Sequence, residues 1–249
     1  MKLISILFLF FTLSFSTFAQ SILIDPGHGG EDCGAKGKLW SRKKLTVICE
    51  KDIALSIAKI IHKRLSKNFS AYLTRSLDRT VTLEERAELA DKIKADIFIS
   101  IHINASTSKS SHGLETFYLD NHDNAAVRKV EEVENKNTKG EQVIINKILA
   151  DLVIDRTAPS SRRMAKLVHR QISTKISKKY GITDRGVKPA IFYVMALSKR
   201  PSILLEVGFM TNTRELKKMI TRKFQNDYAN AVALGIEKYF AKTKSPPLL

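Results

Sequence analysis

The sequence is poor in glycine, proline and cysteine, and each shortage excludes a class of protein. Its 249 residues include 11 Gly, 6 Pro and 2 Cys. So few glycines and prolines exclude a collagen-like or low-complexity chain, and 43% apolar residues exclude an intrinsically disordered one. A chain of this length buries roughly 70–75% of its unfolded surface. We therefore expect a folded domain that needs no disulfide framework.

Acidic residues are also scarce, since 25 Asp and Glu oppose 42 Lys and Arg and leave a formal net charge of +17. A field of this size attracts polyanions. Single-stranded nucleic acid is bound by basic residues interleaved with aromatic ones. The basic stretches 36–51 and 162–188 lack that interleaving, with Trp40 and Tyr180 as the exceptions. We therefore expect no nucleic-acid partner.

Long apolar runs are confined to the N-terminus. A single lysine precedes an apolar run from Leu3 to Phe15, and the small residues Thr17 and Ala19 follow. This is the pattern of a secretory signal peptide, so we expect residues 1–19 to be removed and the chain to be exported to a cell envelope. The alternative is a transmembrane anchor, which needs about 20 apolar residues. No cysteine stands at the cleavage point, and we expect no stable membrane anchor.

Export would place Cys33 and Cys49 in an oxidising compartment, where disulfides form. Their separation in sequence permits a bridge. A bridge also requires Cα atoms within about 7 Å, which the sequence does not establish. Two free thiols remain the alternative.

Strand and helix patterns alternate through residues 20–249. Expected strands are Ser21–Asp25, Ala71–Thr74, Ile97–Ile101, Gly113–Leu119 and Ser202–Leu205, and expected helices include Glu50–Leu65, one from Leu83, Arg162–Ile176 and Asp227–Phe240. Such alternation predicts an α/β fold, a single domain whose mixed, mostly parallel sheet is flanked by helices. Residues 120–160 interrupt the rhythm with a charged stretch and an amphipathic helix from Gln142 to Ile154. We interpret them as an insertion beside the sheet, with a solvated surface excursion as the alternative.

Three polar residues follow or end predicted strands: His28, His102 and Glu206. Ligands of open α/β sheets bind at the carboxyl ends of the strands, so these side chains should converge. For His102 the alternative is a core histidine bonded to a backbone carbonyl. For Glu206 it is an ion pair with a buried arginine, either Arg75 or Arg86.

Two imidazoles and a carboxylate are the ligands of a hydrolytic zinc site. The residues alone leave the third ligand open between Glu31, which has H-x-x-E spacing from His28, and Glu50, which opens the next helix. No HExxH motif is present, so a metalloprotease site carried on a single helix is excluded.

These residues and their surroundings resemble the zinc-dependent N-acetylmuramoyl-L-alanine amidases of bacterial cell walls. The segments that carry the resemblance are Asp25–Gly30, Glu50, Ser100–Ala105 and Glu206–Asn212. The resemblance implies that His28, Glu50 and His102 bind Zn²⁺ and that Glu206 is the catalytic carboxylate. It also implies the activity: cleavage of the amide bond between N-acetylmuramic acid and L-alanine in peptidoglycan, in the periplasm or cell envelope of a bacterium, for wall remodelling or daughter-cell separation.

The resemblance gives the insertion a second interpretation. Members of that family that act in cell division carry, at this point of the chain, a helix that covers the zinc and is displaced by an activator protein. Residues 125–154 would form such a gate, with Glu134 or Glu141 as an additional, inhibitory zinc ligand.

Other functions stay open beside the amidase. A zinc carboxypeptidase or endopeptidase acting on the stem peptides would use a similar metal site. A non-catalytic envelope-binding module is a further alternative, although an intact Glu206 and a complete set of metal ligands speak against it.

Overall fold

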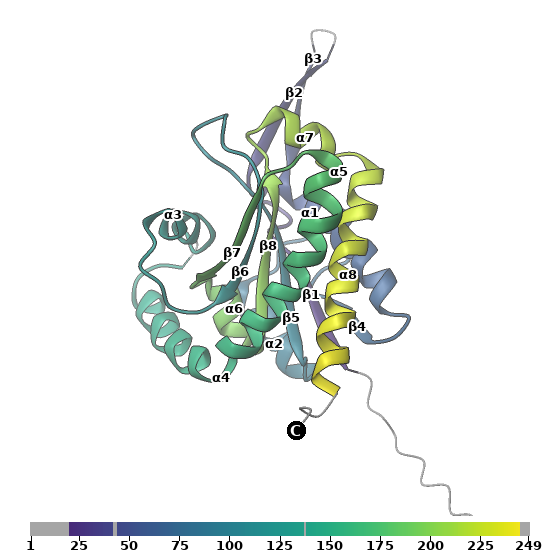
Figure 1. Ribbon diagram of the computed structural model, residues 1–249. Helices are drawn as coiled ribbons and strands as arrows, with labels where there is room; N and C mark the ends of the chain where they lie inside the picture. Colours follow the sequence, from purple (N-terminus) through teal and green to yellow (C-terminus); the bar gives the residue numbers. More distant parts are fainter. Residues whose placement is uncertain (1–19, 42–43, 137, 245–249) are drawn as a thin grey trace, which may run out of the picture.

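The computed structural model describes residues 20–41, 44–136 and 138–244, so the expected signal peptide, residues 1–19, lies outside the described residues. In chain order (Figure 1) the elements are β1 (Ser21–Pro26), β2 (Lys36–Ser41), β3 (Lys44–Cys49), α1 (Glu50–Leu65), β4 (Ser70–Leu73), α2 (Leu83–Lys92), β5 (Ile97–Asn104), β6 (Leu114–Leu119), α3 (Ala125–Glu134), α4 (Glu141–Ile172), the π-helix η1 (Ser173–Ser177), α5 (Lys178–Tyr180), β7 (Asp184–Ala190), α6 (Tyr193–Ser198), β8 (Ser202–Phe209), α7 (Thr213–Met219) and α8 (Arg222–Lys244).

The main sheet has the strand order β4-β1-β5-β8-β6-β7. The first four strands are parallel, β6 pairs with β8 in the antiparallel sense, and β7 is parallel to β6. The predicted single α/β domain with a mixed, mostly parallel sheet is therefore confirmed. Within the described residues, no helix has the length and apolar content that crossing a bilayer requires.

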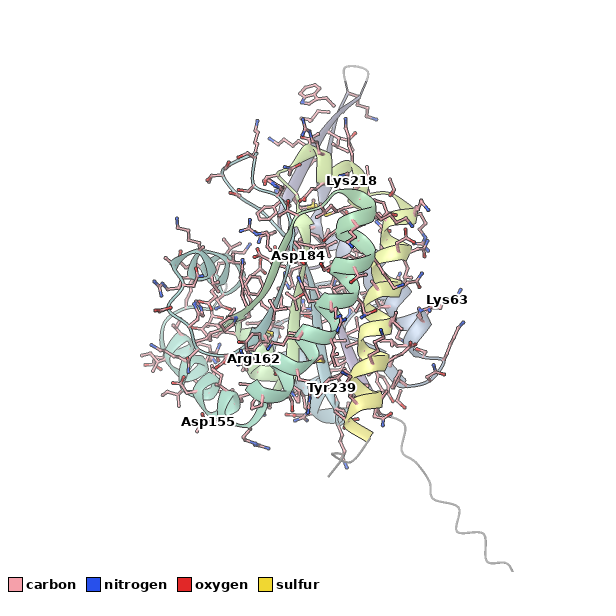
Figure 2. The ribbon with its side chains drawn as sticks, in the orientation of Figure 1. Lys63, Asp155, Arg162, Asp184, Lys218 and Tyr239 are labelled. Carbon is pink, nitrogen blue, oxygen red and sulfur yellow. A yellow bond between two sulfur atoms is a disulfide. The ribbon has the colours of Figure 1, made fainter. Side chains whose placement is uncertain are left out.

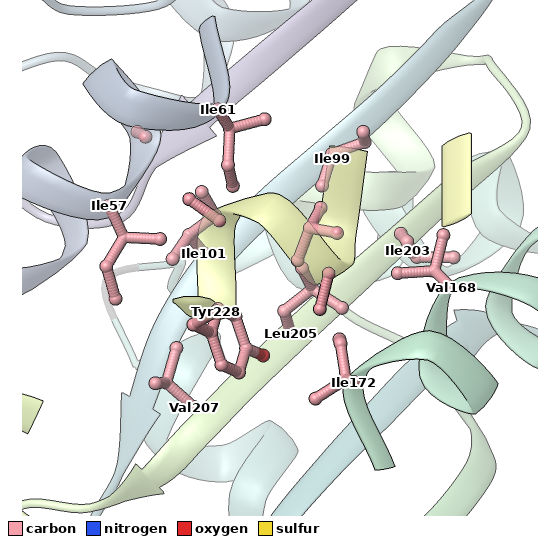
Figure 3. Close-up of a cluster of buried hydrophobic side chains, with 14 of the residues drawn as sticks. Ile57, Ile61, Ile99, Ile101, Val168, Ile172, Ile203, Leu205, Val207 and Tyr228 are labelled. Carbon is pink, nitrogen blue, oxygen red and sulfur yellow. The ribbon is translucent and has the colours of Figure 1, made fainter. Parts of the chain in front are cut away.

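One face of the sheet carries the larger core. Isoleucines of β5 such as Ile99 and Ile101 pack there, together with Leu205 of β8. Figure 3 shows these strands meeting side chains from three helices: Ile57 and Ile61 of α1, Val168 and Ile172 of α4, and Tyr228 of α8. This face is mostly apolar, although Thr116 of β6 meets His169 of α4 on it.

The opposite face carries the polar residues. Successive residues of a strand point to opposite sides, so Ser100 and His102 of β5 share the face of Phe98, which packs with α2. Glu206 of β8 likewise shares the face of Leu204, which packs with α3 and α6. Strand periodicity alone therefore directs the candidate site residues to one side of the sheet.

Strands β5 and β8, which carry His102 and Glu206, extend further than expected. β5 continues to Asn104 and β8 to Phe209, so His102 and Glu206 lie inside strands and pair directly across β5 and β8. The predictions that the strands end at these residues were wrong, because the ladder continues past the polar residues.

The helix boundaries in the insertion also differ. A helix ending at Ile154 and a separate one starting at Arg162 were expected, but α4 runs without interruption through Pro159. A proline inside a helix removes a backbone hydrogen bond and usually breaks the helix. Here Ile154 packs into the smaller core and Met164 into the larger one, and this burial holds the helix together. Figure 1 shows that the axis of α4 changes direction along its length, as expected of a helix that contains proline.

The hairpin β2–β3 was not predicted and stands outside the main sheet, at the top of Figure 1. A disulfide between Cys33 and Cys49 ties its base, with Cα atoms 5.1 Å apart. The pairing that the sequence left open is therefore settled. Cys49 also occupies the N-cap of α1, so the hairpin leads directly into the residue that opens that helix, Glu50.

Candidate metal centre

His28 lies on a tight loop after β1 and has a left-handed backbone, with φ of 57°. Buried arginines hold this loop by its carbonyl oxygens. Arg75 donates to the Gly27 carbonyl at 2.8 Å, and Arg86 donates to the His28 carbonyl at 3.1 Å. Gly27 is required here, since a Cβ at this position would lie 2.5 Å from the His102 ring. The loop can therefore bring the two histidines together.

Arg86 also forms a buried ion pair with Asp25, which accepts hydrogen bonds from Thr74 and Ser100. Burial alone would raise the pKa of Asp25, but Arg86 and the two hydroxyl groups hold it below its usual value. Because Arg86 is committed to Asp25 and Arg75 to backbone carbonyls, the alternative of an arginine partner for Glu206 is wrong.

His28, Glu50 and His102 converge as expected. The Glu50 carboxylate lies 3.2 Å from His28 Nε2 through one oxygen and 3.2 Å from His102 Nδ1 through the other. One potential ligand atom from each residue lies within 4.8 Å of the others. Glu31, the alternative third ligand, is exposed on the loop.

Backbone amides fix the Glu50 carboxylate in place. Oε2 accepts a hydrogen bond from the Ala35 N–H at 2.7 Å, and Oε1 accepts one from the Ile103 N–H at 2.8 Å. Asp32 lies 2.8 Å from His28 Nδ1, which orients the imidazole so that Nε2 points into the cluster. The sequence did not single out Asp32, because an acidic residue in a polar loop carries no distinguishing pattern.

The residues present fit a divalent cation. His28 Nε2 and His102 Nδ1 are buried and face carboxylate oxygens of Glu50 and Glu134, but neither makes a hydrogen bond of good geometry among the described residues. Unpartnered buried nitrogens are costly, and two imidazoles with a carboxylate are a ligand set that zinc accepts. His102 is therefore not a core histidine bonded to a backbone carbonyl.

The charged groups of the cluster shift one another's pKa values. Burial lowers the pKa of His28, but the Glu50 carboxylate and the Asp32 hydrogen bond outweigh it and raise that pKa to about 9. The pKa of His102 is also raised, because Glu134 and Glu50 outweigh its burial. The pKa of Glu50 is lowered, since the two histidines outweigh its burial. The cluster thus stabilises positive charge at its centre.

Glu206 lies beside His102 in the strand register and is fully buried. Neither of its carboxylate oxygens has a hydrogen-bond partner among the described residues. Burial raises its pKa well above the usual value, and the charge of Glu134 raises it further. An unpartnered carboxylate with a raised pKa next to a candidate metal site is suited to proton transfer.

Glu134, at the end of α3, reaches the same cluster. Its Oε2 lies 2.9 Å from His102 Nδ1 and 3.7 Å from His28 Nε2. Glu141 is exposed at the start of α4 and is not brought to the cluster. Glu134 lines both a cleft of about 540 Å³ and a smaller cavity of about 160 Å³, so α3 covers the candidate site.

Hydrogen bonds fasten α3 in this position. The Asn135 side chain donates to the Ile191 carbonyl at 2.9 Å and accepts from the Tyr193 N–H at 3.0 Å. Glu131 accepts from the Ile191 N–H and lies 2.7 Å from His122. The helix is therefore attached to the segment around Ile191 and Tyr193 by polar contacts and to the smaller core by Val127 and Val130.

Comparison with known proteins identifies the family. A model of the N-acetylmuramoyl-L-alanine amidase family, Amidase_3, matches residues 22–238. The chain is 33% identical over 230 residues to the N-acetylmuramoyl-L-alanine amidase AmiC of Escherichia coli O6:H1, covering 88% of this chain and 52% of that protein. It is 31% identical over 229 residues to AmiA of Escherichia coli K12, covering 88% and 75%. The chain belongs to the N-acetylmuramoyl-L-alanine amidase family, although it spans only about half the length of AmiC.

Two solved amidase structures have a fold similar to that of this chain. An N-acetylmuramoyl-L-alanine amidase from Clostridium difficile 630 superposes with a TM-score of 0.68 at 28% identity, covering 92% of this chain and all of that one (100%). The amidase AmiC2 of Nostoc punctiforme gives a TM-score of 0.67 at 32% identity, with 89% and 97% covered. Both similarities extend over nearly the whole fold described above.

The raised pKa of His28 predicts how the metal-free protein responds to pH. In the folded state this pKa is about 9, against a usual value of 6.5. The stability that His28 contributes is therefore complete below about pH 6.5 and is lost as the pH rises through about 9. Denaturant unfolding in the presence of chelator should show a falling free energy of unfolding across this window. The slope should be shallower in His28→Gln, and an equal slope in both proteins would contradict the assignment.

Proposed function

We propose that this chain is a zinc-dependent amidase that cleaves the bond between N-acetylmuramic acid and L-alanine in peptidoglycan. The observation that carries the proposal is the convergence of His28, Glu50 and His102 next to an unpartnered, buried Glu206. We assign the first three residues as zinc ligands and Glu206 as the catalytic carboxylate. Residues 20–249 would form the catalytic domain, and residues 1–19 would direct its export to the periplasm or cell envelope.

The chemistry follows from the position of Glu206. Zinc, when bound, would acidify water and polarise the scissile carbonyl. Glu206 then accepts the proton of the attacking water, whose oxygen bonds to the lactyl carbonyl carbon. Glu206 then passes the proton to the amide nitrogen of L-alanine as the bond between this nitrogen and the lactyl carbonyl carbon breaks. The products are a lactyl carboxylate on the glycan and a stem peptide with a free L-alanine amine.

The raised pKa of Glu206 suits both halves of this task. A carboxylate with an ordinary pKa is a weak base at neutral pH, whereas burial and the nearby Glu134 raise the pKa of Glu206. The pKa of Glu206 is thereby moved toward the pH at which the enzyme works. A residue that acts as both general base and general acid is most effective when its pKa lies near that pH. Displacing Glu134 would remove one of the negative charges that raise this pKa.

We further propose that residues 120–160 regulate the site. Glu134 would occupy a position at the metal that substrate needs, and α3 would act as a gate. The contacts of Glu134 with both histidines support this. Opening the gate requires that the Asn135 and Glu131 contacts be exchanged for others and that Val127 leave the smaller core.

An activator protein is the partner that would exchange those contacts. The first half of α4 exposes an apolar stripe with i, i+4, i+8 spacing, formed by Ile144, Ile148 and Leu152, which are 63%, 58% and 62% exposed. Monomeric proteins rarely expose contiguous apolar patches without an interaction purpose. We propose that an activator binds this stripe and displaces the segment 125–154.

The ligand and base assignments predict different losses. Replacing Glu206 with Gln should reduce turnover by about a hundredfold to ten-thousandfold while zinc stays bound. Replacing His102 with Ala should remove both zinc and activity. Zinc content by mass spectrometry and released fragments from purified peptidoglycan, with and without chelator, measure these effects. Full zinc and activity in His102→Ala would contradict the assignment, and cleavage within stem peptides would favour a carboxypeptidase or endopeptidase.

The gate predicts a gain of activity. Replacing Glu134 with Gln should raise basal hydrolysis on the order of tenfold, equivalent to about 1.4 kcal/mol, because it removes the negative charge that lies 2.9 Å from His102 Nδ1. Glu141→Gln is the matched control, since that carboxylate is exposed and does not line the cleft at the cluster. Unchanged or lower activity in Glu134→Gln, at equal zinc content, would make the insertion purely structural.

A further inference from the structure

The β2–β3 hairpin has two unlike faces. The inner face packs on the body of the protein, since Leu39 and Ile48 pack against the larger core and Gly37 lies against Leu216 of α7. The outer face carries Trp40 beside its cross-strand partner Leu45, and Val47 beside its partner Lys38. Only the inner face takes part in folding.

The outer face is an exposed apolar patch with positive charge around it. Trp40 is 70% exposed, Val47 50% and Leu45 40%. Lys36, Lys38 and Lys44 are also exposed, and the described residues of the hairpin include no acidic side chain. Single exposed apolar residues are common, but a cluster of them on one flat face indicates a binding surface.

The hairpin is held rigidly despite its small size. A two-stranded hairpin alone is marginally stable in water, yet this one is closed at its base by the Cys33–Cys49 disulfide and is packed against α7. A binding surface on rigid elements loses little conformational entropy when it engages a ligand.

The hairpin is joined directly to the candidate metal centre. Its second strand ends at Cys49, immediately before Glu50, and Ala35, immediately before its first strand, donates its N–H to Glu50. Leu45 precedes Glu50 by five positions, which is roughly 17 Å along an extended strand. A polymer held at the metal centre can therefore reach the outer face of the hairpin.

We propose that this outer face binds the glycan strand of the polymer whose amide bond the metal centre cleaves, an inference that rests on the proposed amidase function. The negative face of an indole ring attracts polarised C–H groups, which sugar rings present on their flat sides. Leu45 and Val47 widen the apolar surface. The lysines are placed to pair with carboxylates of the stem peptides, which lie along the same strand.

A lipid bilayer is the competing ligand, because tryptophan, aliphatic and lysine side chains also favour membrane interfaces. On the described strands, however, these side chains stand in cross-strand pairs on one face of the hairpin. The apolar residues lie along the side of the hairpin, as contact with an extended polymer requires.

A direct test is available because Trp40 is the only tryptophan of the chain. Its fluorescence emission reports on the hairpin alone. In the zinc-loaded full chain with Glu206→Gln, soluble glycan strands should shift the emission to shorter wavelength and protect it from acrylamide quenching. Vesicles of phosphatidylglycerol and phosphatidylcholine should do neither. An unchanged emission with glycan strands, or a shift only with vesicles, would overturn the proposal.

Kinetics separate this surface from the catalytic site. Trp40→Ala should raise KM for long glycan strands about tenfold, equivalent to 1.4 kcal/mol, with kcat unchanged and with no effect on a single disaccharide-peptide. Tyr72→Ala, which removes an exposed aromatic side chain from β4, is the matched control and should change neither. Lys38→Gln should weaken binding of peptide-bearing strands and leave peptide-free strands unaffected.

Two results would count against different proposals. An equal loss in Trp40→Ala on the long and short substrates would overturn the glycan-binding surface. Failure of the Glu134→Gln protein, which lacks the carboxylate that closes the site, to cleave either substrate would contradict the amidase function, while the fluorescence titration would still decide whether the hairpin binds glycan.

Discussion

The buried carboxylate of Glu50 connects the parts of this protein that matter for its chemistry. One oxygen accepts the Ala35 N–H at the base of the hairpin and faces His28, while the other accepts the Ile103 N–H in β5 and faces His102. A single side chain thus fixes the positions of two loops, one strand and two imidazoles. Its negative charge in a buried setting requires positive charge nearby, which the histidines supply and a bound cation would add to.

The distribution of charge follows from the same arrangement. The chain has few acidic residues, and several of them, including Asp25, Glu50 and Glu206, are buried around the centre. The surface is accordingly even more basic than the composition suggests. Figure 2 shows labelled basic residues on three different helices, Lys63 of α1, Arg162 of α4 and Lys218 of α7. Such widely spread positive charge favours approach to an anionic polymer as a whole.

Much of the fold and of the candidate metal centre could be predicted from the sequence. The expected helices from Glu50 and from Leu83 are present, as α1 and α2 begin at these residues. The convergence of His28 and His102 followed from their places in the strand pattern. The choice of Glu50 over Glu31 needed the family resemblance, because both carboxylates were within reach in sequence.

The continuity of α4 through Pro159 could not be predicted, since tertiary burial on both sides of the proline decides it. The hairpin was missed because its glycine and lysine residues break the alternation that marks a strand.

The central claim is that His28, Glu50 and His102 form a zinc centre and that Glu134 closes it in the resting chain. X-ray absorption at the zinc edge of the purified, zinc-loaded protein tests this most directly. The account predicts a first shell of two imidazole nitrogens and carboxylate oxygens, with one oxygen contribution changed in Glu134→Gln. A shell that contains sulfur, fewer than two imidazoles, or no change in Glu134→Gln would contradict it.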